Sequence, residues 1–189
     1  DLHVTGDVKV DETLTDGEFK VSVNGLSLER KVEMFQWQEN KKTEKKKKAG
    51  GKVQKKTTYT YEKTWSSSAI SSGSFKEEGH DNPGALPYEG KTVAAKKAKL
   101  GAYDLSSGIT SSLGSSEQLK ITDKDLKKMP KALRARAKIH NGGIYVGKDP
   151  IKPAIGDVRI TFNVRKPGTA SVVAGQYGKQ LKAFTHKKL

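Results

Sequence analysis

The sequence contains no cysteine and only four histidines among its 189 residues. Without cysteine the chain has no disulfide, no thiol nucleophile and no zinc–thiolate site. None of the four histidines has a second histidine or a carboxylate at metal-ligand spacing. They are His3, His80, His140 and His186. We therefore expect no metal site and no cofactor.

Sequence motifs of common enzyme classes are also missing. The chain has no Gly-x-Ser-x-Gly elbow, no phosphate-binding loop and no dinucleotide fingerprint. Paired acids such as Glu77-Glu78 and Asp11-Glu12 are adjacent in sequence, so in a strand or loop their side chains point apart. We predict that the chain is not an enzyme. Catalysis would require the fold to bring His80 and carboxylates together in a cleft.

Long apolar runs are lacking as well. No stretch reaches the length needed to span a bilayer as a helix, so we expect the chain as given to be soluble. It begins at Asp1 without an initiator methionine or a signal-like apolar segment. These features predict a processed or excised portion of a longer protein.

Positive charge is abundant and unevenly distributed. Lys and Arg total 36 against 21 acids, a formal net charge of +15, and residues 41–56 carry nine lysines against the single Glu44, or 9 − 1 = +8. Such a segment is compatible with a solvated loop, a polyanion contact or a juxtamembrane anchor. Because it has no arginine, sequence-specific nucleic-acid reading is disfavoured and nucleic acid is not the expected partner. The candidate polyanion contacts are Lys45, Lys46, Lys47, Lys48, Lys55 and Lys56.

Two segments have the alternating pattern of β-hairpins. Residues 19–23 and 26–28 alternate around Asn24-Gly25, a pair that tolerates the positive φ of a type I′ turn. Near the other end, alternating apolar residues at 158–164 are followed by Lys166-Pro167-Gly168 and a second alternating run at 169–174. We predict one antiparallel hairpin at each place.

Residues 30–40 and 57–66 predict a further antiparallel pair, with 41–56 as its long, exposed, lysine-rich loop. This pair is rich in aromatic residues. They are interpreted as sheet core, with a base-stacking platform as the alternative. The aromatic residues are Phe35, Trp37, Tyr59, Tyr61 and Trp65.

Residues 66–90 are rich in Ser, Gly and Pro and are predicted to form a loop. Within them, His80-Asp81-Asn82-Pro83 is the most site-like stretch, and His80 and Asn82 are candidate interaction residues. The alternative is a hydrogen-bonded turn without a binding role. A short strand is expected at 91–95.

Helical patterns are few. Leu105, Ile109 and Leu113 are spaced for a short helix over 104–113, and Thr122 with Asp125 predicts a capping box for a second helix, which Pro130 interrupts. The fold class is therefore mainly β with minor α: antiparallel hairpins forming small OB-like barrels or sheets, with one or two short helices. One domain over 1–189 is expected, with two β subdomains at about 1–100 and 101–189 as a variant.

The order of several short motifs resembles the LUMA (transmembrane protein 43) family over nearly the whole chain. Each motif is short, and they follow one another in the family's order. The motifs are Asp11-Glu12-x-Leu14-Thr15-Asp16, Val21-Ser22-Val23-x-Gly25-Leu26-x-Leu28, Val32-Glu33-Met34-Phe35-Gln36-Trp37, Thr58-Tyr59-x-Tyr61-Glu62-Lys63-x-Trp65, Gly79-His80-x-Asn82-Pro83, Leu100-Gly101-Ala102, Asp157-Val158-Arg159-Ile160 and Ser171-Val172-Val173-Ala174-Gly175-Gln176.

This resemblance implies a non-catalytic extracytoplasmic domain of a multi-pass membrane protein. The domain would lie in the lumen of the endoplasmic reticulum and nuclear envelope, or in a bacterial periplasm. It would be tethered by membrane segments outside this chain. A scaffolding role is implied, with other membrane or envelope proteins as partners and with self-association. The alternative function is binding of a polyanion, either anionic lipid or nucleic acid, through the lysine-rich loop.

Overall fold

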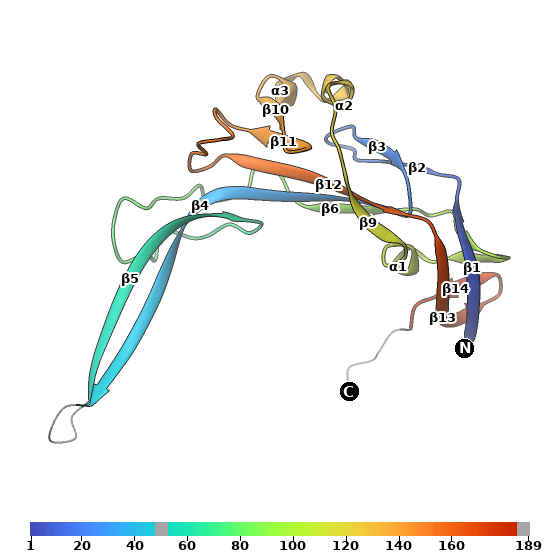
Figure 1. Ribbon diagram of the computed structural model, residues 1–189, viewed down its shortest axis with the longest axis horizontal. Coiled ribbons are helices and arrows are strands. Elements are labelled where there is room, and N and C mark those ends of the chain that lie inside the picture. The colour runs from blue at the N-terminus through green and yellow to red at the C-terminus, as the bar shows by residue number, and fades with distance from the viewer. Residues whose placement is uncertain (48–52, 185–189) are drawn as a thin grey trace. The chain divides into compact units, whose positions relative to one another are not determined.

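The computed structural model describes residues 1–47 and 53–184, and their secondary structure is mainly β (Figure 1). This confirms the predicted fold class. The strands are β1 (Leu2–Val10), β2 (Thr13–Thr15), β3 (Ser22–Asn24), β4 (Ser27–Lys47), β5 (Val53–Ser66), β6 (Lys91–Ala94), β7 (Ala98–Leu100), β8 (Tyr103–Leu105), β9 (Ser115–Leu119), β10 (Ala137–His140), β11 (Gly143–Val146), β12 (Val158–Lys166), β13 (Thr169–Tyr177) and β14 (Gln180–Lys182). The helices are α1 (Ser107–Thr110), α2 (Asp123–Lys128) and α3 (Lys131–Arg134).

The described chain contains three short helices, where one or two were predicted. The helix expected over 104–113 shrinks to α1, because its first residues form β8. Helix α2 has the predicted capping box: the Asp125 carboxylate accepts hydrogen bonds from the backbone N–H and the hydroxyl of Thr122, at 3.0 and 2.6 Å. Pro130 then separates α2 from α3. No helix in the described ranges is both long and apolar enough to cross a membrane.

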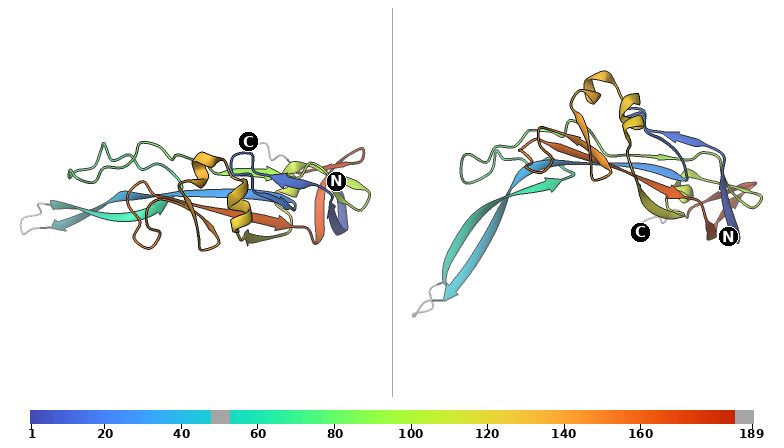
Figure 2. Two further views of the ribbon diagram at one scale, coloured as in Figure 1. Left: turned by 90° about the horizontal axis from the view of Figure 1, so that it is seen from above. Right: turned by 45° about the horizontal axis from the view of Figure 1, so that its top comes forward.

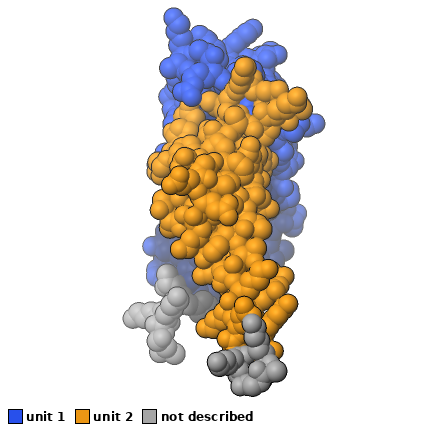
Figure 3. Space-filling view, turned by 90° about the vertical axis from the view of Figure 1, so that its left-hand side faces the viewer, with its two compact units in different colours: residues 1–31, 90–145, 160–189 blue, residues 32–89, 146–159 orange. Residues whose placement is uncertain are grey.

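The chain divides into two compact units, coloured separately in Figure 3. Unit 1 comprises residues 1–31, 90–145 and 160–189, and unit 2 comprises residues 32–89 and 146–159. The predicted division near residue 100 differs from this one. Each unit draws on separate stretches of sequence because the strands pair across long sequence separations.

Unit 1 contains a closed five-stranded barrel with the order β1-β13-β14-β8-β7. Neighbouring strands are antiparallel except β14 and β8, which are parallel. Apolar side chains from the barrel strands and from α1 fill its core, including Val8, Leu100, Leu105, Ile109 and Leu181. Leu26, from the segment between β3 and β4, packs with them. A small barrel was predicted, whereas its OB-like character stays a prediction.

A seven-stranded sheet has the order β10-β11-β12-β4-β5, with β6 also paired to β4 and β9 to β12. The predicted pairing of 30–40 with 57–66 is confirmed: Phe35 is opposite Trp65 and Glu39 is opposite Tyr61. The register continues to Lys47 opposite Val53. Residues 41–47 and 53–56 are therefore strand, so the prediction of a long loop over 41–56 was wrong. Two strands whose side chains are polar on both faces can still pair as a hairpin, although neither face is buried.

The hairpin predicted at Asn24-Gly25 is absent from the described residues. Strand β3 pairs with β2, so that Val23 is opposite Leu14 and not opposite a residue of the segment 26–28. Gly25 is required here for close packing: a Cβ atom would lie 2.6 Å from Cγ2 of Val164 and 2.9 Å from the Arg165 carbonyl oxygen. A glycine is thus needed at position 25 because β12 packs closely against it, and not because of a type I′ turn.

The two strands predicted on either side of Pro167-Gly168 are present, but they do not pair with each other as a hairpin. Strand β12 pairs with β9, placing Lys166 opposite Ser115, whereas β13 pairs with β1, placing Thr169 opposite Asp7. Pro167 and Gly168 thus form a corner at which the chain leaves the larger sheet and enters the barrel. A turn with positive φ at two successive residues occurs instead at Asn141-Gly142 between the neighbouring strands β10 and β11, where φ is +49° and +73°.

Candidate functional site

The predicted interaction residues His80 and Asn82 lie in unit 2, in the loop over residues 67–90, hereafter the 67–90 loop. Five of the six predicted lysine contacts lie on the distal part of the β4–β5 hairpin, which extends past this loop (Figures 1 and 2). Tyr61, which contacts His80, is six residues from Lys55 along β5, or about 20 Å. The structure therefore holds two separate candidate sites. Lys48 lies outside the described residues.

Asn82 fastens the 67–90 loop to the edge of β4. Its Oδ1 accepts a hydrogen bond from the Trp37 N–H at 2.7 Å, and its Nδ2 donates to the Trp37 carbonyl at 2.8 Å and to the Ile70 carbonyl at 3.1 Å. The amide thus pairs with both backbone groups of Trp37, as a neighbouring strand residue would. Of the two interpretations of Asn82, these contacts support the hydrogen-bonded structural one.

Gln36 makes a second attachment that the sequence analysis did not identify. Its side chain is fully buried, and its Nε2 donates to the Ser68 carbonyl at 3.0 Å while its Oε1 accepts from the Ile70 N–H at 2.8 Å. A signal was present in the sequence, because a glutamine interrupts the otherwise apolar run from Met34 to Trp37. A buried amide needs partners on both its oxygen and its nitrogen, and the loop backbone supplies them.

The aromatic residues of β4 and β5 form a row on one face of the hairpin, partly covered by the 67–90 loop. Phe35 and Trp65 are opposite each other with ring centroids 5.1 Å apart, and the His80 ring stacks on Tyr61 at 3.9 Å and meets Trp37 edge-on at 4.7 Å. These side chains are half-buried, so the prediction that they belong to the sheet core was wrong.

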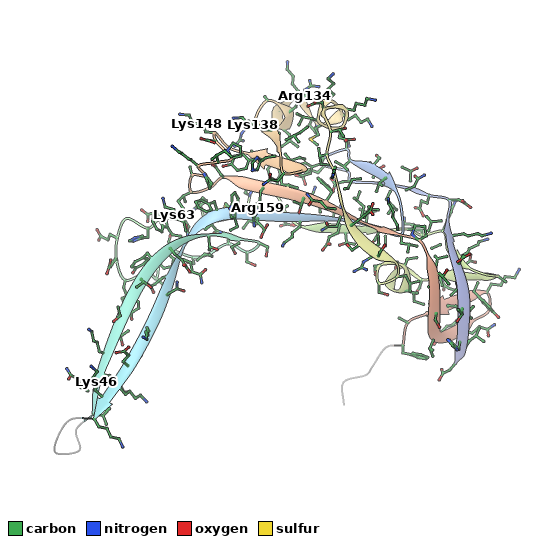
Figure 4. All side chains as sticks on the ribbon, viewed as in Figure 1. Lys46, Lys63, Arg134, Lys138, Lys148 and Arg159 are labelled. Carbon is green, nitrogen blue, oxygen red and sulfur yellow. The ribbon has the colours of Figure 1, made fainter. Side chains whose placement is uncertain are left out.

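Cations interleave with this aromatic row. The Lys63 ammonium lies 4.7 Å from the Trp37 ring centroid, and the Arg159 guanidinium carbon lies 4.6 Å from that of Trp65. Arg159 also forms an ion pair with Glu33 at 2.8 Å. Figure 4 labels both cations, Lys63 on β5 and Arg159 on β12. These faces of Trp37 and Trp65 are thus already occupied by protein cations.

Glu39 links the aromatic row to the loop backbone. Its Oε2 accepts hydrogen bonds from the Tyr61 hydroxyl and from the Lys76 N–H, both at 2.6 Å, while the Tyr61 oxygen accepts the Glu77 N–H at 2.9 Å. The bond from Tyr61 is the largest cause that lowers the pKa of Glu39 below its ordinary value. Partial burial, followed by the bond to Glu39, raises the pKa of Tyr61.

The 67–90 loop also borders a hollow of about 440 Å³. His80 lines it together with acidic residues, Glu77, Glu78 and Asp81. The Nδ1 atom of His80 lies 3.4 Å from the Glu77 carbonyl oxygen. Within residues 1–47 and 53–184, no three His, Asp or Glu side chains are placed so that they could hold a metal ion together.

The second site consists of exposed lysines on paired strands. Lys45 is opposite Lys55, Lys46 is opposite Gln54, and Lys56 is opposite Glu44. Five of the six predicted polyanion contacts are thus placed on one hairpin, and each is solvent-exposed. Figure 4 shows Lys46 near its far end. The strand register, which the sequence did not reveal, sorts these lysines onto two faces.

Comparison with known proteins identifies the family to which the chain is similar. The model of the family described as "Transmembrane protein 43" matches residues 34–189. Rat transmembrane protein 43 is 28% identical over 98% of this chain and 48% of its own length, and the human protein is 27% identical over the same shares. The Drosophila melanogaster homologue is 26% identical over 86% of this chain and 42% of its own length.

The chain spans about half the length of these curated relatives. No solved structure matches it significantly. The family match covers well over half of the chain and agrees with the resemblance seen in its ordered motifs. The chain therefore belongs to the transmembrane protein 43 (LUMA) family.

Proposed function

We propose that this chain is a non-catalytic, extracytoplasmic domain of a membrane-anchored protein and that it acts as a scaffold for protein–protein contacts in membrane or envelope organisation. Its relatives are named transmembrane proteins and are about twice as long as the chain, which supports a membrane tether. The partners are other membrane or envelope proteins and second copies of the same protein.

The observation that carries this proposal is the attachment of the 67–90 loop to β4 and β5. Asn82 of the loop binds both backbone groups of Trp37 on β4, and Gln36 of β4 binds the loop backbone through both ends of its amide. Glu39 accepts a further backbone N–H from the loop. A long connection held in this way presents a fixed surface, as binding modules do. The side chains of Gln36, Glu39 and Asn82 are engaged in holding that surface.

Photo-crosslinking in the membrane tests the scaffold role. A photoreactive residue is placed at exposed Ser74 or Glu78 of the 67–90 loop in the full-length protein, with exposed Lys9 on β1 as the matched control position. The proposal predicts crosslinks from the loop positions to other membrane proteins or to a second copy. Loop positions that yield no more crosslinks than Lys9 would count against it.

A second candidate function is anion binding through the β4–β5 hairpin. The observation that favours it is the set of exposed lysines on the paired strands β4 and β5. Figures 1 and 2 show that these strands extend beyond the 67–90 loop. Binding of this kind releases counterions, so the affinity should fall steeply with salt. A titration of the 189-residue chain with anionic vesicles at increasing salt tests it, and an affinity independent of salt would contradict it.

A further inference from the structure

The two faces of the distal β4–β5 hairpin differ in charge. Directly opposite residues of an antiparallel pair share a face, and successive residues alternate between faces. The register therefore divides the side chains between two faces. One face, hereafter the cationic face, carries Lys41, Lys45, Lys47, Val53, Lys55 and Tyr59 with two threonines. The other, hereafter the mixed face, carries Lys42, Glu44, Lys46, Gln54, Lys56 and Thr58.

On the mixed face, the acid neutralises part of the charge. Glu44 is opposite Lys56, and its Oε1 lies 2.9 Å from Nζ of Lys42. On the cationic face, Lys45 is directly opposite Lys55, and the residues described there between Lys41 and Tyr59 include no acid. Directly opposed like charges destabilise a strand pair, so this face favours an external anion.

Apolar groups accompany the cations on the same face. Val53 is 52% exposed and is opposite Lys47 at the far end of the described strands, and Tyr59 lies under Lys41, whose ammonium is 5.9 Å from the ring centroid. Lysine stems are themselves apolar up to the ammonium group. The cationic face therefore combines point charges with exposed apolar surface.

This combination favours a lipid surface over nucleic acid. Recognition of single-stranded nucleic acid relies on arginine and on several stacking aromatic rings. The paired residues from Lys41 to Tyr59 include no arginine and only one aromatic residue, and that ring is half-buried under Lys41. Lysines that meet a charged bilayer need no such geometry, because each contributes as a point charge near the surface.

We propose that the cationic face of the β4–β5 hairpin binds the anionic phospholipid headgroups of a bilayer surface, with Lys41, Lys45, Lys47 and Lys55 as the contacts. The inference rests on the second candidate function and identifies its ligand and its face. Val53 enters the headgroup region beside Lys47. The hairpin thereby holds unit 2 against the membrane.

The hairpin offers a matched pair of variants. Lys41→Gln/Lys45→Gln/Lys55→Gln removes three charges from the cationic face, and Lys42→Gln/Lys46→Gln/Lys56→Gln removes three from the mixed face of the same two strands. Binding of the 189-residue chain to phosphatidylcholine vesicles with and without 30% phosphatidylserine is measured by cosedimentation. Thermal denaturation of each variant checks that folding is retained.

The proposal predicts no binding to neutral vesicles and binding to anionic ones. Because a lysine near an anionic surface contributes roughly a fivefold gain in affinity, the cationic-face variant should bind about 100-fold more weakly than the wild type. The mixed-face variant should lose much less, and Val53→Ser should weaken the binding that remains at high salt. A single-stranded oligonucleotide at the same salt serves as the second ligand.

Each outcome has a separate meaning. Equal losses in the two triple variants would overturn the assignment to the cationic face while leaving anion binding intact. Tighter binding to the oligonucleotide than to anionic vesicles would overturn the lipid assignment. If neither ligand binds in a salt-dependent way, the second candidate function fails together with this inference, whereas the scaffold proposal is decided by the crosslinking experiment.

Discussion

Asp16 and Arg30 form an ion pair in the interior of unit 1, with Oδ1 of the carboxylate 3.0 Å from Nη1 of the guanidinium. Both side chains are almost fully buried. The same Oδ1 accepts the backbone N–H groups of Glu18 and Phe19, and the Arg30 guanidinium carbon lies 4.8 Å from the Phe19 ring centroid. Asp16 therefore fixes the turn after β2 and provides a buried partner for the charge of Arg30.

Replacement of Asp16 by alanine should destabilise the protein by about 3 kcal/mol, because it removes the buried partner of Arg30. The free energy of unfolding in urea measures this. Glu18→Gln is the control: Glu18 also pairs with Arg30, at 2.7 Å, but its side chain is 47% exposed. Its loss should cost less than about 1 kcal/mol. Equal effects from the two substitutions would contradict the expectation that the buried pair contributes more than the exposed one.

Asn82→Ala should release the 67–90 loop from β4. The variant loses bonds to both backbone groups of Trp37, and we expect destabilisation of about 1–3 kcal/mol. Hydrogen exchange at the Trp37 amide should become faster, since Asn82 is its acceptor. Asn82→Asp keeps an acceptor but lacks the Nδ2 donor, so it should protect that amide better than alanine does. Unchanged exchange in Asn82→Ala would show that the amide does not hold the loop.

Glu39 should make the stability depend on pH in the acidic range. Its pKa in the folded protein is lowered, so its contribution is present above the unfolded pKa and is lost as the pH falls through the folded pKa. The Tm of the wild type should exceed that of Glu39→Gln at pH 7, and the difference should shrink below a pH of about 4. Thermal melts of both proteins from pH 7 to pH 3 measure it, and a constant difference would exclude the ionised carboxylate as the cause.

Gly25→Ala should destabilise unit 1 by about 1–3 kcal/mol, because the added methyl group would overlap Val164 and the Arg165 carbonyl of β12. Gly17→Ala is the matched control, since nothing lies within 4 Å of a Cβ atom there. The difference in unfolding free energy between the two variants checks the close approach. Two equally stable variants would leave Gly25 without a packing role.

The strands could be predicted from the sequence because burial follows the alternation of side chains. Val158, Ile160, Phe162 and Val164 are all buried, as their spacing required. Their pairing could not be predicted, because a local turn signal such as Pro167-Gly168 does not specify which sheet the next strand enters. That choice depends on β1 and β9, which are distant in sequence.

The candidate sites were predictable in location but not in geometry. The lysine-rich segment was identified by its composition. Its strands were not predicted, because the segment lacks the alternation of apolar and polar residues by which a strand is recognised. The opposition of Lys45 to Lys55 depends on a register that only the folded hairpin reveals. His80 and Asn82 were predicted together as interaction residues. In the structure the Asn82 side chain hydrogen-bonds to the backbone of Trp37, and the His80 ring stacks on the ring of Tyr61.

Protease protection of the full-length protein tests the proposed placement of this domain most directly. Membrane vesicles are sealed with their cytoplasmic face outward and treated with a protease, and peptides from the exposed 67–90 loop are followed by mass spectrometry. An extracytoplasmic domain predicts that these peptides stay intact until detergent opens the vesicles. Cleavage of the loop in sealed vesicles would contradict the account.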